Sequence, residues 1–249
     1  MTKLVAFDLD DTLAPSKQAL PAPMGAALQR LLDVVEVCII SGGQIGQFEA
    51  QVLSNLELTE DQAKRLHLMP TCGTRYYTWD GAGFGLRYAH DLTAEESQEA
   101  RRTVEEQARR LGLWEEKPWG DILEDRGSQI TFSALGQEAP LEAKKTWDPT
   151  GEKKEKLRAA VAELLPSLEV RSGGSTSVDI TKKGVDKAYG MKRLAQETGI
   201  DLDSMLFVGD RLDEGGNDYP VKVLGVDCVA VEGWEETVEV VNAFVSERV

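Results

Sequence analysis

The stretch Lys3–Pro15, KLVAFDLDDTLAP, decides the fold. Its residues Leu4 to Phe7 form a short apolar run followed by turn residues, which is typical of a parallel strand covered on both faces. In open α/β sheets, ligands bind at the carboxyl ends of the strands, and charges gathered there repel one another unless a cation or a proton intervenes. Three carboxylates follow the run within four residues: Asp8, Asp10 and Asp11. The stretch therefore predicts a ligand-binding sheet edge that holds a cation.

Composition narrows the class of partner. The chain has 249 residues, 41% of them hydrophobic and 29% charged, which is ordinary for a folded protein with one large or two modest domains. The formal net charge is −15 and the pI is near 4.7. A protein with this much negative charge repels polyanions, which argues against a nucleic acid or an anionic membrane as partner. A phosphorylated substrate would need locally concentrated positive charge.

The cysteines and the chain start point to a cytoplasmic protein. Cys38, Cys72 and Cys228 lie far apart without metal-ligand spacing, and two of them lie inside apolar runs. We expect reduced core thiols, and hence a reducing compartment. No apolar stretch approaches the roughly 20 residues of a membrane span, and Met1 to Lys3 lead directly into the first strand without a signal peptide.

Strands and helices alternate over most of the chain. Further strand-like runs occur at Val34–Ile40, Met205–Val208 and Val226–Val231, and Gly184–Thr198 has a helical pattern. This βα alternation predicts an α/β fold with a Rossmann-like parallel sheet.

The middle of the chain has a different pattern. One expected helix begins with the capping box Thr93-Ala94-Glu95-Glu96 and ends at Gly112. A second spans about Glu152 to Leu165 and stops before Pro166, with an apolar face of Leu157, Val161, Leu164 and Leu165. Strand pairs flank the helices: Asp121–Glu124 with Gln129–Ala134, and Leu168–Arg171 with Ser177–Thr181. We therefore expect a core made of residues 1–86 and 184–249, with an inserted α+β cap domain at 87–183.

Three further clusters accompany the opening carboxylates. A strand ends at Ser41-Gly42-Gly43 before a helix, so Ser41 could either hold a phosphate oxygen beside helix amides or serve only as a helix N-cap. Lys187 stands at a helix start in Gly-Val-Asp-Lys, with Lys182 and Lys183 as nearby rivals. A strand then delivers Asp210 at its carboxyl end, and a second acid, Asp218, follows a glycine-rich loop.

These four clusters, in this order, resemble the motifs of the haloacid dehalogenase (HAD) superfamily of phosphotransferases. The opening Asp8-Leu9-Asp10-Asp11-Thr12 matches D-x-D-x-T, its motif I. An α+β cap between the second and third motifs resembles the type IIB caps. Within that group, SGG, GGSTSVDI, GVDK and GDRLDEGGND are most similar to the eukaryotic-type phosphomannomutases, over nearly the full chain.

The resemblance implies a Mg²⁺-dependent reaction through an aspartyl-phosphate. Mg²⁺ would be held by the carboxylates of Asp8 and Asp210 and by the backbone carbonyl of Asp10. Asp8 would attack phosphorus, and the Asp10 side chain would act as acid and then as base. Lys187 would neutralise the developing charge, Ser41 and Gly42 would hold the phosphoryl group, and Asn217 and Asp218 would orient the metal-bound waters and Lys187.

The same resemblance places substrate contacts in the cap. They fall on Arg126, Ser177 and Asp179, whereas arginines of the family are replaced at Lys17, Gln137 and Lys144. Lys17 and Lys144 remain candidate substrate-binding residues. Arginine clamps phosphate in a bidentate manner and lysine or glutamine does not, so a sugar-phosphate phosphatase is expected ahead of a phosphomannomutase. A homodimer through the cap is also compatible with the resemblance.

Two alternatives belong to other classes. A response-regulator receiver also gathers acids and Mg²⁺ at strand ends, but its single small domain leaves no role for the insert. A non-catalytic sugar-phosphate sensor on the same fold would be expected to have lost Asp8 or Asp10, and both are present.

Overall fold

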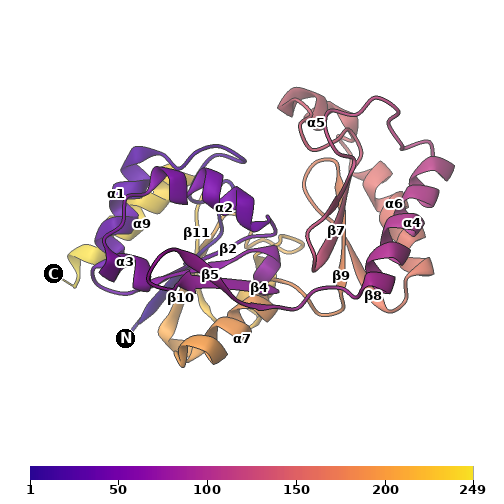
Figure 1. Cartoon of the computed structure of the whole chain (residues 1–249). Helices are drawn as coiled ribbons and strands as arrows, with labels where there is room; N and C mark the ends of the chain where they lie inside the picture. The colour runs from indigo at the N-terminus through magenta and orange to yellow at the C-terminus, as the bar shows by residue number, and fades with distance from the viewer. Residues whose placement is uncertain (249) are drawn as a thin grey trace. The chain divides into compact units, whose positions relative to one another are not determined.

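The computed structural model describes residues 1–248 and divides into two compact units (Figure 1). The core unit comprises Met1–Ala89 and the chain from Asp186 onward, and the cap unit is His90–Val185. The cap boundary expected from the sequence, residue 87, falls inside strand β5 (Phe84–Ala89). Residues 87–89 lie in the core unit because β5 pairs with β4 (Arg75–Trp79).

The described residues of the core unit form a seven-stranded sheet in the order β11-β10-β1-β2-β3-β4-β5. The strands from β11 to β3 are parallel, and β4 and β5 extend the sheet antiparallel. The remaining strand bounds are β1 (Leu4–Phe7), β2 (Glu36–Ile40), β3 (Leu66–Met69), β10 (Met205–Gly209) and β11 (Asp227–Ala230). The predicted α/β class with a parallel sheet is confirmed, and the antiparallel extension is an addition that the sequence did not predict.

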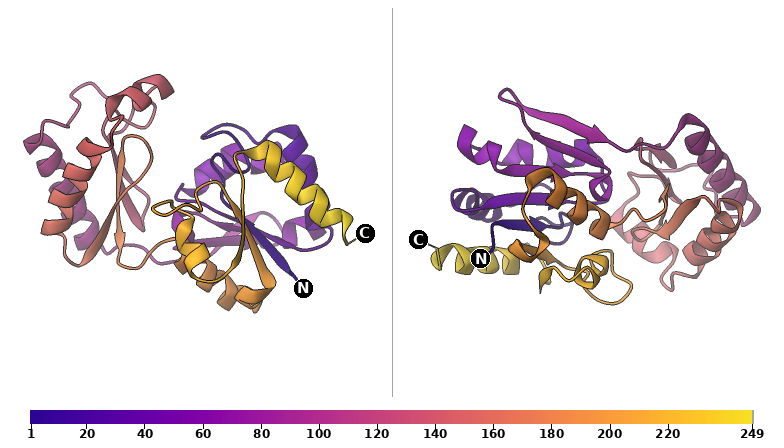
Figure 2. Two further views of the ribbon diagram at one scale, coloured as in Figure 1. Left: turned by 180° about the vertical axis from the view of Figure 1, so that it is seen from behind. Right: turned by 90° about the horizontal axis from the view of Figure 1, so that it is seen from below.

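Helices cover both faces of this sheet, as the two views in Figure 2 show. Successive residues of β1 alternate between the faces: Val5 and Phe7 join the apolar cluster that includes α1 and α9, whereas Leu4 and Ala6 join the cluster of α7 and α8. This two-sided burial explains the uninterrupted apolar run of the first strand. The helices are α1 (Ala22–Leu32), α2 (Ile45–Gln51), α3 (Glu60–Lys64), α7 (Lys187–Thr198), α8 (Tyr219–Val223) and α9 (Trp234–Ser246), with short 3₁₀ turns at Leu53–Asn55, Thr71–Gly73 and Leu202–Ser204.

The described cap residues form a four-stranded antiparallel sheet in the order β6-β7-β9-β8. Its elements are α4 (Ala94–Arg110), β6 (Leu123–Asp125), β7 (Gln129–Ser133), α5 (Leu141–Trp147), α6 (Glu152–Leu164), β8 (Leu168–Ser172) and β9 (Ser177–Lys182). The expected capping box at Thr93 is present. Helix α5 was not predicted from the sequence.

One face of the cap sheet is apolar and carries α4 and α6. Val104 of α4 and Leu157 of α6 pack with Phe132 of β7 in a single buried cluster. Leu164 was expected on this buried face but is 51% exposed, because the helix ends there and Leu165 turns inward instead. The alternate positions of β7 and β9 face the other way and are polar: Gln129, Thr131, Ser133, Ser177, Asp179 and Thr181. We call this the polar cap face.

Two smaller expectations need correction. The three cysteines form no disulfide; Cys38 is buried, and Cys72 and Cys228 are partly exposed. Strand β2 begins at Glu36 rather than Val34, because Val34 and Val35 hydrogen-bond back to Leu31 at the end of α1.

Among the described residues, no helix has the length and apolar character needed to cross a membrane.

Candidate active site

Neighbouring parallel strands bring the two aspartates of the first and last motifs together. In the β1–β10 ladder Phe7 lies beside Val208, and the Asp8 N–H donates to the Val208 carbonyl at 3.0 Å. Asp8 and Asp210 therefore leave their strands at the same carboxyl edge, although about 200 positions separate them in the sequence.

A buried lysine joins this edge from the start of α7. The Lys187 Nζ lies 2.6 Å from Asp8 Oδ1 and 2.5 Å from Asp218 Oδ1, and the Lys187 side chain is 1% exposed. The Asp186 side chain caps α7 by accepting the Tyr189 N–H at 2.9 Å, which fixes the turn that carries Lys187. Of the two rivals, Lys182 ends strand β9 and Lys183 is exposed, so Lys187 is the lysine that the fold directs to the cluster.

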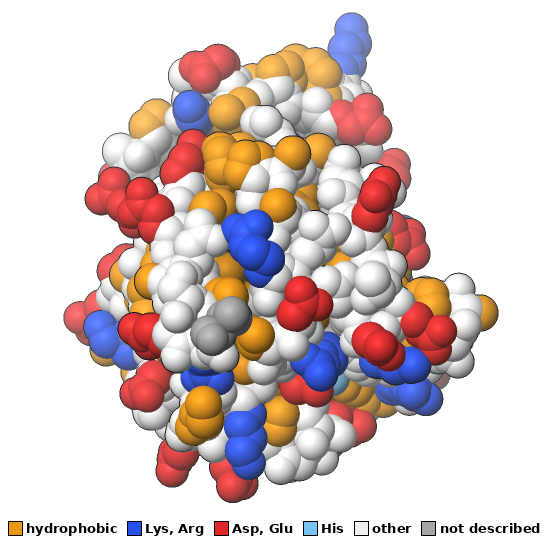
Figure 3. All heavy atoms as spheres, turned by 90° about the vertical axis from the view of Figure 1, so that its left-hand side faces the viewer, with side chains coloured by type: hydrophobic (Ala, Val, Ile, Leu, Met, Phe, Trp, Pro, Cys, Tyr) orange, Lys and Arg blue, Asp and Glu red, His pale blue; other side chains and the backbone are white. Residues whose placement is uncertain are grey.

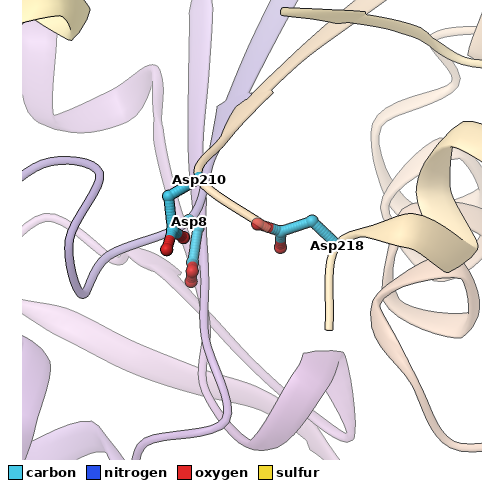
Figure 4. Close-up of side chains that lie close together, drawn as sticks. All are labelled: Asp8, Asp210 and Asp218. Carbon is cyan, nitrogen blue, oxygen red and sulfur yellow. The ribbon is translucent and has the colours of Figure 1, made fainter. Parts of the chain in front are cut away.

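Asp8, Asp210 and Asp218 form a compact group (Figure 4) in which one carboxylate oxygen from each lies within 4.8 Å of the others. Asp218 is fully buried, and its second oxygen accepts the Arg211 N–H at 3.1 Å. A Cβ at Gly209 would collide with Asp218 Oδ2, so the glycine makes room for this carboxylate. Asp210 Oδ1 also accepts a long hydrogen bond from Thr12 Oγ1, at 3.4 Å.

Asp8 and Asp210 are held in an environment that raises the pKa of each carboxyl group. Burial is the largest influence on Asp8 and raises its pKa, against the opposing effect of Lys187; Asp218 raises it further. Burial and then Asp218 also raise the pKa of Asp210. Burial alone would lower the pKa of Lys187, but Asp8 and Asp218 raise it overall, so the lysine stays charged.

The donor set of this group suits a hard divalent cation. Among the described residues, the group gathers three buried or half-buried carboxylates, two of which contact the ammonium of Lys187, so the group carries excess negative charge when ionised. Its donors are all oxygen atoms, the ligands preferred by Mg²⁺ and Ca²⁺, and neither histidine nor cysteine belongs to the described group. A bound cation would allow Asp8 and Asp210 to ionise together.

Asp10 and Asp11 have hydrogen-bond partners outside that group. Asp10 Oδ1 accepts the Lys17 N–H at 2.7 Å, and Asp10 Oδ2 accepts the Gln47 amide at 2.8 Å. Asp11 is exposed, has φ +59°, and accepts the Ser16 N–H at 3.0 Å. The three carboxylates of the opening stretch thus diverge after the strand and face three different surroundings.

Ser41 lies at the carboxyl end of β2 and is buried. Its Oγ accepts the Gly43 N–H at 3.2 Å, and the next turn of chain closes over the loop because the Cys72 N–H donates to the Ser41 carbonyl. The N-cap of α2 is Gln44, so the alternative that Ser41 is the helix N-cap is wrong. Ser41 and Gly42 therefore lie in a loop just before a helix N-terminus, the setting expected for phosphate contacts.

Two other predicted residues lie at the periphery of the core unit. Asn217 is exposed on the turn that precedes Asp218. Lys17 is exposed in the loop after β1, where its backbone, at φ +58°, is the part that contacts Asp10.

In the cap unit, Arg126 is the centre of a charged cluster. Its Nη2 and Nε donate to Glu124 Oε2 at 2.6 and 2.9 Å, and the two side chains are only 12% and 19% exposed. Asp179, on the polar cap face, accepts the Thr131 hydroxyl at 2.8 Å. Burial raises the pKa of Asp179, and the nearby positive charge of Arg126 opposes that rise. Arg126 is thus balanced by two carboxylates.

The other predicted cap residues lie farther along the same sheet or beyond it. Ser177 pairs with Ser133 in the β7–β9 ladder. The side-chain amide of Gln137 donates to Ser133 Oγ at 3.0 Å. The ammonium of Lys144, on α5, donates to the backbone carbonyl of Gln137 at 2.8 Å. Positions 137 and 144 are therefore coupled to each other through this carbonyl.

Sequence reasoning missed several residues that complete these clusters. Gln47 and Gln51 are four positions apart on α2, which places them on one helix face, but nothing local reveals that the face meets Asp10. Glu124 stands two positions before Arg126, so the pattern E-x-R alone suggests a carboxylate partner for this arginine. Thr131 follows the alternation of its strand.

Known proteins resemble this chain in sequence. The family described as haloacid dehalogenase-like hydrolase matches residues 136–221. The phosphomannomutase of Encephalitozoon cuniculi is 27% identical over 239 residues, covering 86% of this chain and 82% of its own. Human phosphomannomutase 1 is 26% identical over 224 residues, with 88% of this chain and 82% of its own covered.

Solved structures share the fold at low sequence identity. The IMP-bound, N-terminally truncated IMP-nucleotidase of Plasmodium falciparum superposes with a TM-score of 0.69 at 13% identity, covering 99% of this chain and 68% of its own. A haloacid dehalogenase-like hydrolase from Bacteroides thetaiotaomicron gives 0.63 at 14% identity, covering 98% of this chain and 100% of its own. With the motifs gathered at one sheet edge and a cap inserted between them, the chain is an enzyme that is similar to the haloacid dehalogenase-like hydrolases and, over most of its length, to the phosphomannomutases.

Proposed function

We propose that the protein is a Mg²⁺-dependent phosphotransferase that acts on a sugar phosphate through an aspartyl-phosphate, with water as the final acceptor. The observation that carries the proposal is the buried contact of Asp8 with Lys187, beside Asp210 and Asp218 at the carboxyl edge of the sheet. A carboxylate held against a fixed cation at a ligand-binding edge is suited to attack an electrophile that carries negative charge.

Asp8 and Asp210 would hold Mg²⁺ together with the Asp10 carbonyl, while Asp218 acts outside this set. Both Asp218 oxygens are already engaged, one by Lys187 and one by the Arg211 N–H, which suits it to orient the lysine. Asn217, on the adjacent turn, would contact metal-bound water. When bound, the cation would neutralise charge on the transferring phosphoryl group.

The protein's own groups account for the proton and phosphoryl transfers. An Asp8 oxygen forms a bond to phosphorus while the bond from phosphorus to the sugar oxygen breaks, and Asp10 gives that oxygen its proton. Asp10 then takes a proton from water, whose oxygen attacks the aspartyl-phosphate and releases phosphate. Lys187, Ser41 and the amides near Gly42 would stabilise the phosphoryl oxygens in both halves.

The polar cap face, together with Arg126 near Asp179, would contact the sugar. Arg126, Ser177 and Asp179 offer donors and acceptors suited to hydroxyl groups, with Lys17 and Lys144 as further candidates. The acidic composition and the face shown in Figure 3, where acidic side chains are spread with basic ones scattered among them, support a small substrate rather than a nucleic acid. A homodimer through the cap and a cytoplasmic location remain part of the proposal, the latter supported by three cysteines that form no disulfide.

The charges of the cap cluster favour hydrolysis over mutase activity. A mutase must grip the second phosphate of a bisphosphate intermediate and exclude water from the aspartyl-phosphate. Here Arg126 is balanced by Glu124 and Asp179, and Gln137 supplies no charge. The Lys144 ammonium is hydrogen-bonded to a backbone carbonyl. Weak retention of a second phosphate would leave the aspartyl-phosphate to water.

Phosphomannomutase is the second candidate, and the similarity of the chain to such enzymes over 86–88% of its length favours it. The two are separated by following mannose 1-phosphate with phosphorus NMR, in Mg²⁺ and catalytic glucose 1,6-bisphosphate. We expect inorganic phosphate as the main product. Accumulation of mannose 6-phosphate with little free phosphate would establish the mutase instead, and silence on a full panel of sugar phosphates and on p-nitrophenyl phosphate would reject both.

A further inference from the structure

The Asp10 carboxylate accepts the Lys17 N–H of its own loop at 2.7 Å, and its side-chain partners come from the helix that follows the second motif. Gln47, on α2, donates its amide to Asp10 Oδ2 at 2.8 Å. Gln51, one turn later, makes a longer contact of 3.4 Å to Oδ1, and its amide is bonded at 2.7 Å to the Gln18 carbonyl. Gln47 is therefore the side chain with the shorter and more direct hold on Asp10.

The loop before α2 is shaped around this glutamine. A Cβ added at Gly43 would collide with Gln47 Oε1 and would lie 2.7 Å from Gln47 Cδ. The side-chain amide thus lies across the loop in the space that any other residue at position 43 would occupy. Phe48, the next residue of α2, is fully buried and anchors the helix that carries Gln47.

We propose that Gln47 is a positioning residue for Asp10, which fixes the carboxylate oxygen opposite the one that the Lys17 N–H holds, and that Gly43 is small because the Gln47 amide needs its space. The inference rests on the proposed function, in which Asp10 gives a proton to the departing sugar oxygen and later takes one from water. Asp10 can do so only if its carboxyl group points at the reacting oxygen, and its flexible side chain is turned by the contact with Gln47.

A glutamine is chemically suited to this task. Its NH₂ group donates to a carboxylate, and its carbonyl oxygen can accept from a carboxylic acid after the amide turns over. Lysine or arginine at position 47 could only donate. One neutral side chain can therefore hold Asp10 both before and after it has given up its proton.

The leaving group of the substrate provides the test. The nitrophenolate of p-nitrophenyl phosphate leaves without a proton, whereas a sugar oxygen needs one. The variant Gln47→Met keeps the length of the side chain and removes its hydrogen bonds. We expect kcat/KM for a sugar phosphate to fall by about tenfold or more, because general acid catalysis contributes roughly 10²–10⁴. kcat/KM for p-nitrophenyl phosphate, which reports the first phosphoryl transfer, should stay within about threefold. A general disturbance of the phosphate loop would lower both values equally and would overturn the inference.

Two controls separate this inference from the proposed function. Asp10→Asn is the benchmark: if it shows no dependence on the leaving group, the acid role of Asp10 itself is wrong. If Asp10→Asn shows the dependence and Gln47→Met does not, only the inference about Gln47 fails. Glu49→Ala changes an exposed residue of the same helix and should leave both substrates unaffected.

The part played by Gly43 is tested with a double-mutant cycle. Gly43→Ala should displace the Gln47 amide and reproduce the selective loss on the sugar phosphate. Because both changes break the same contact, Gly43→Ala combined with Gln47→Met should be no worse than Gly43→Ala alone. Additive losses would show that Gly43 serves a different purpose.

Discussion

Lys187 and Asp218 form an ion pair of 2.5 Å between Nζ and Oδ1, with side chains that are 1% and 0% exposed. Removing one partner of a buried pair leaves an uncompensated charge, which typically costs about 3–5 kcal/mol. We therefore expect Lys187→Met to lower the free energy of unfolding by that order in urea titrations at pH 8 with chelator. Lys183→Met, at an exposed position nearby, should change it by less than about 0.5 kcal/mol. Equal effects of the two substitutions would contradict the pairing.

Asp8→Asn should abolish turnover and leave the fold intact. The change removes the proposed nucleophile at nearly constant size, and losing a member of a covalent mechanism usually costs several orders of magnitude in kcat. Asp11→Asn is the matched control, because Asp11 is exposed and an asparagine tolerates its φ of +59°. We expect the control to stay within a few-fold of the wild type. Retention by Asp8→Asn of more than about a hundredth of the wild-type rate would reject the assignment.

Metal binding should be visible without an assay of turnover. Mg²⁺ added to chelator-treated protein should raise the Tm. At a Mg²⁺ concentration 100-fold above Kd, binding adds about 2.7 kcal/mol to the free energy of unfolding. Asp210→Asn removes a carboxylate of the group and should abolish most of this shift. Asp213→Asn, which changes an exposed acid three positions later, should preserve it. Calorimetry showing no Mg²⁺ binding to the wild type would exclude this metal site.

The metal-free protein should lose stability as pH rises. Burial raises the pKa of Asp8 in the folded state, to about 7, above its value in the unfolded chain. The folded state therefore binds more protons, and stability present near pH 4 is lost as pH rises through about 7. In chelator we expect unfolding free energies to fall by on the order of 1–3 kcal/mol between pH 5 and pH 8. Asp8→Asn should flatten this dependence. A free energy of unfolding of the wild type that rises between about pH 5 and pH 8 would contradict the raised pKa of Asp8.

Arg126→Ala should weaken binding of phosphorylated sugars selectively. The guanidinium lies in the cap cluster that we propose to contact the sugar, and a hydrogen bond to a charged group contributes about 1.5–3 kcal/mol. KM for the sugar phosphate should therefore rise by about tenfold or more, while KM for p-nitrophenyl phosphate changes less than about threefold. Arg158→Ala, on the helix side of the cap, controls for loss of a surface ion pair. Parallel increases for both substrates would show that Arg126 supports the fold rather than the substrate.

The core elements of the site could be predicted because each is encoded locally. An apolar run followed by acids specifies both a strand and its functional end, so this pattern alone assigns Asp8 and Asp210 to the same sheet edge. Lys187 could be chosen over Lys183 because Asp186 marks the helix start.

Other features depend on contacts that no local pattern carries. The antiparallel strands β4 and β5 contain mixed polar and apolar residues, so their half-exposed positions gave no clear alternation. The meeting of Gln47 with Asp10 joins residues 37 positions apart and is set by how α2 packs on the sheet. Lys144 contacts the backbone carbonyl of Gln137 rather than its side chain, and the amino-acid types at the two positions do not reveal such a contact.

The sheet order β11-β10-β1-β2 also has a consequence for how the molecule is made. During synthesis Asp8 is made before the whole cap segment, whereas Asp210 and Asp218 are made after it. The ladder between β1 and β10 therefore cannot close until the cap segment has been made, and the group of Asp8, Asp210 and Asp218 is completed only after it. The cap sheet draws its strands from one continuous segment, so its pairing can be complete while the ribosome is still adding the second half of the core.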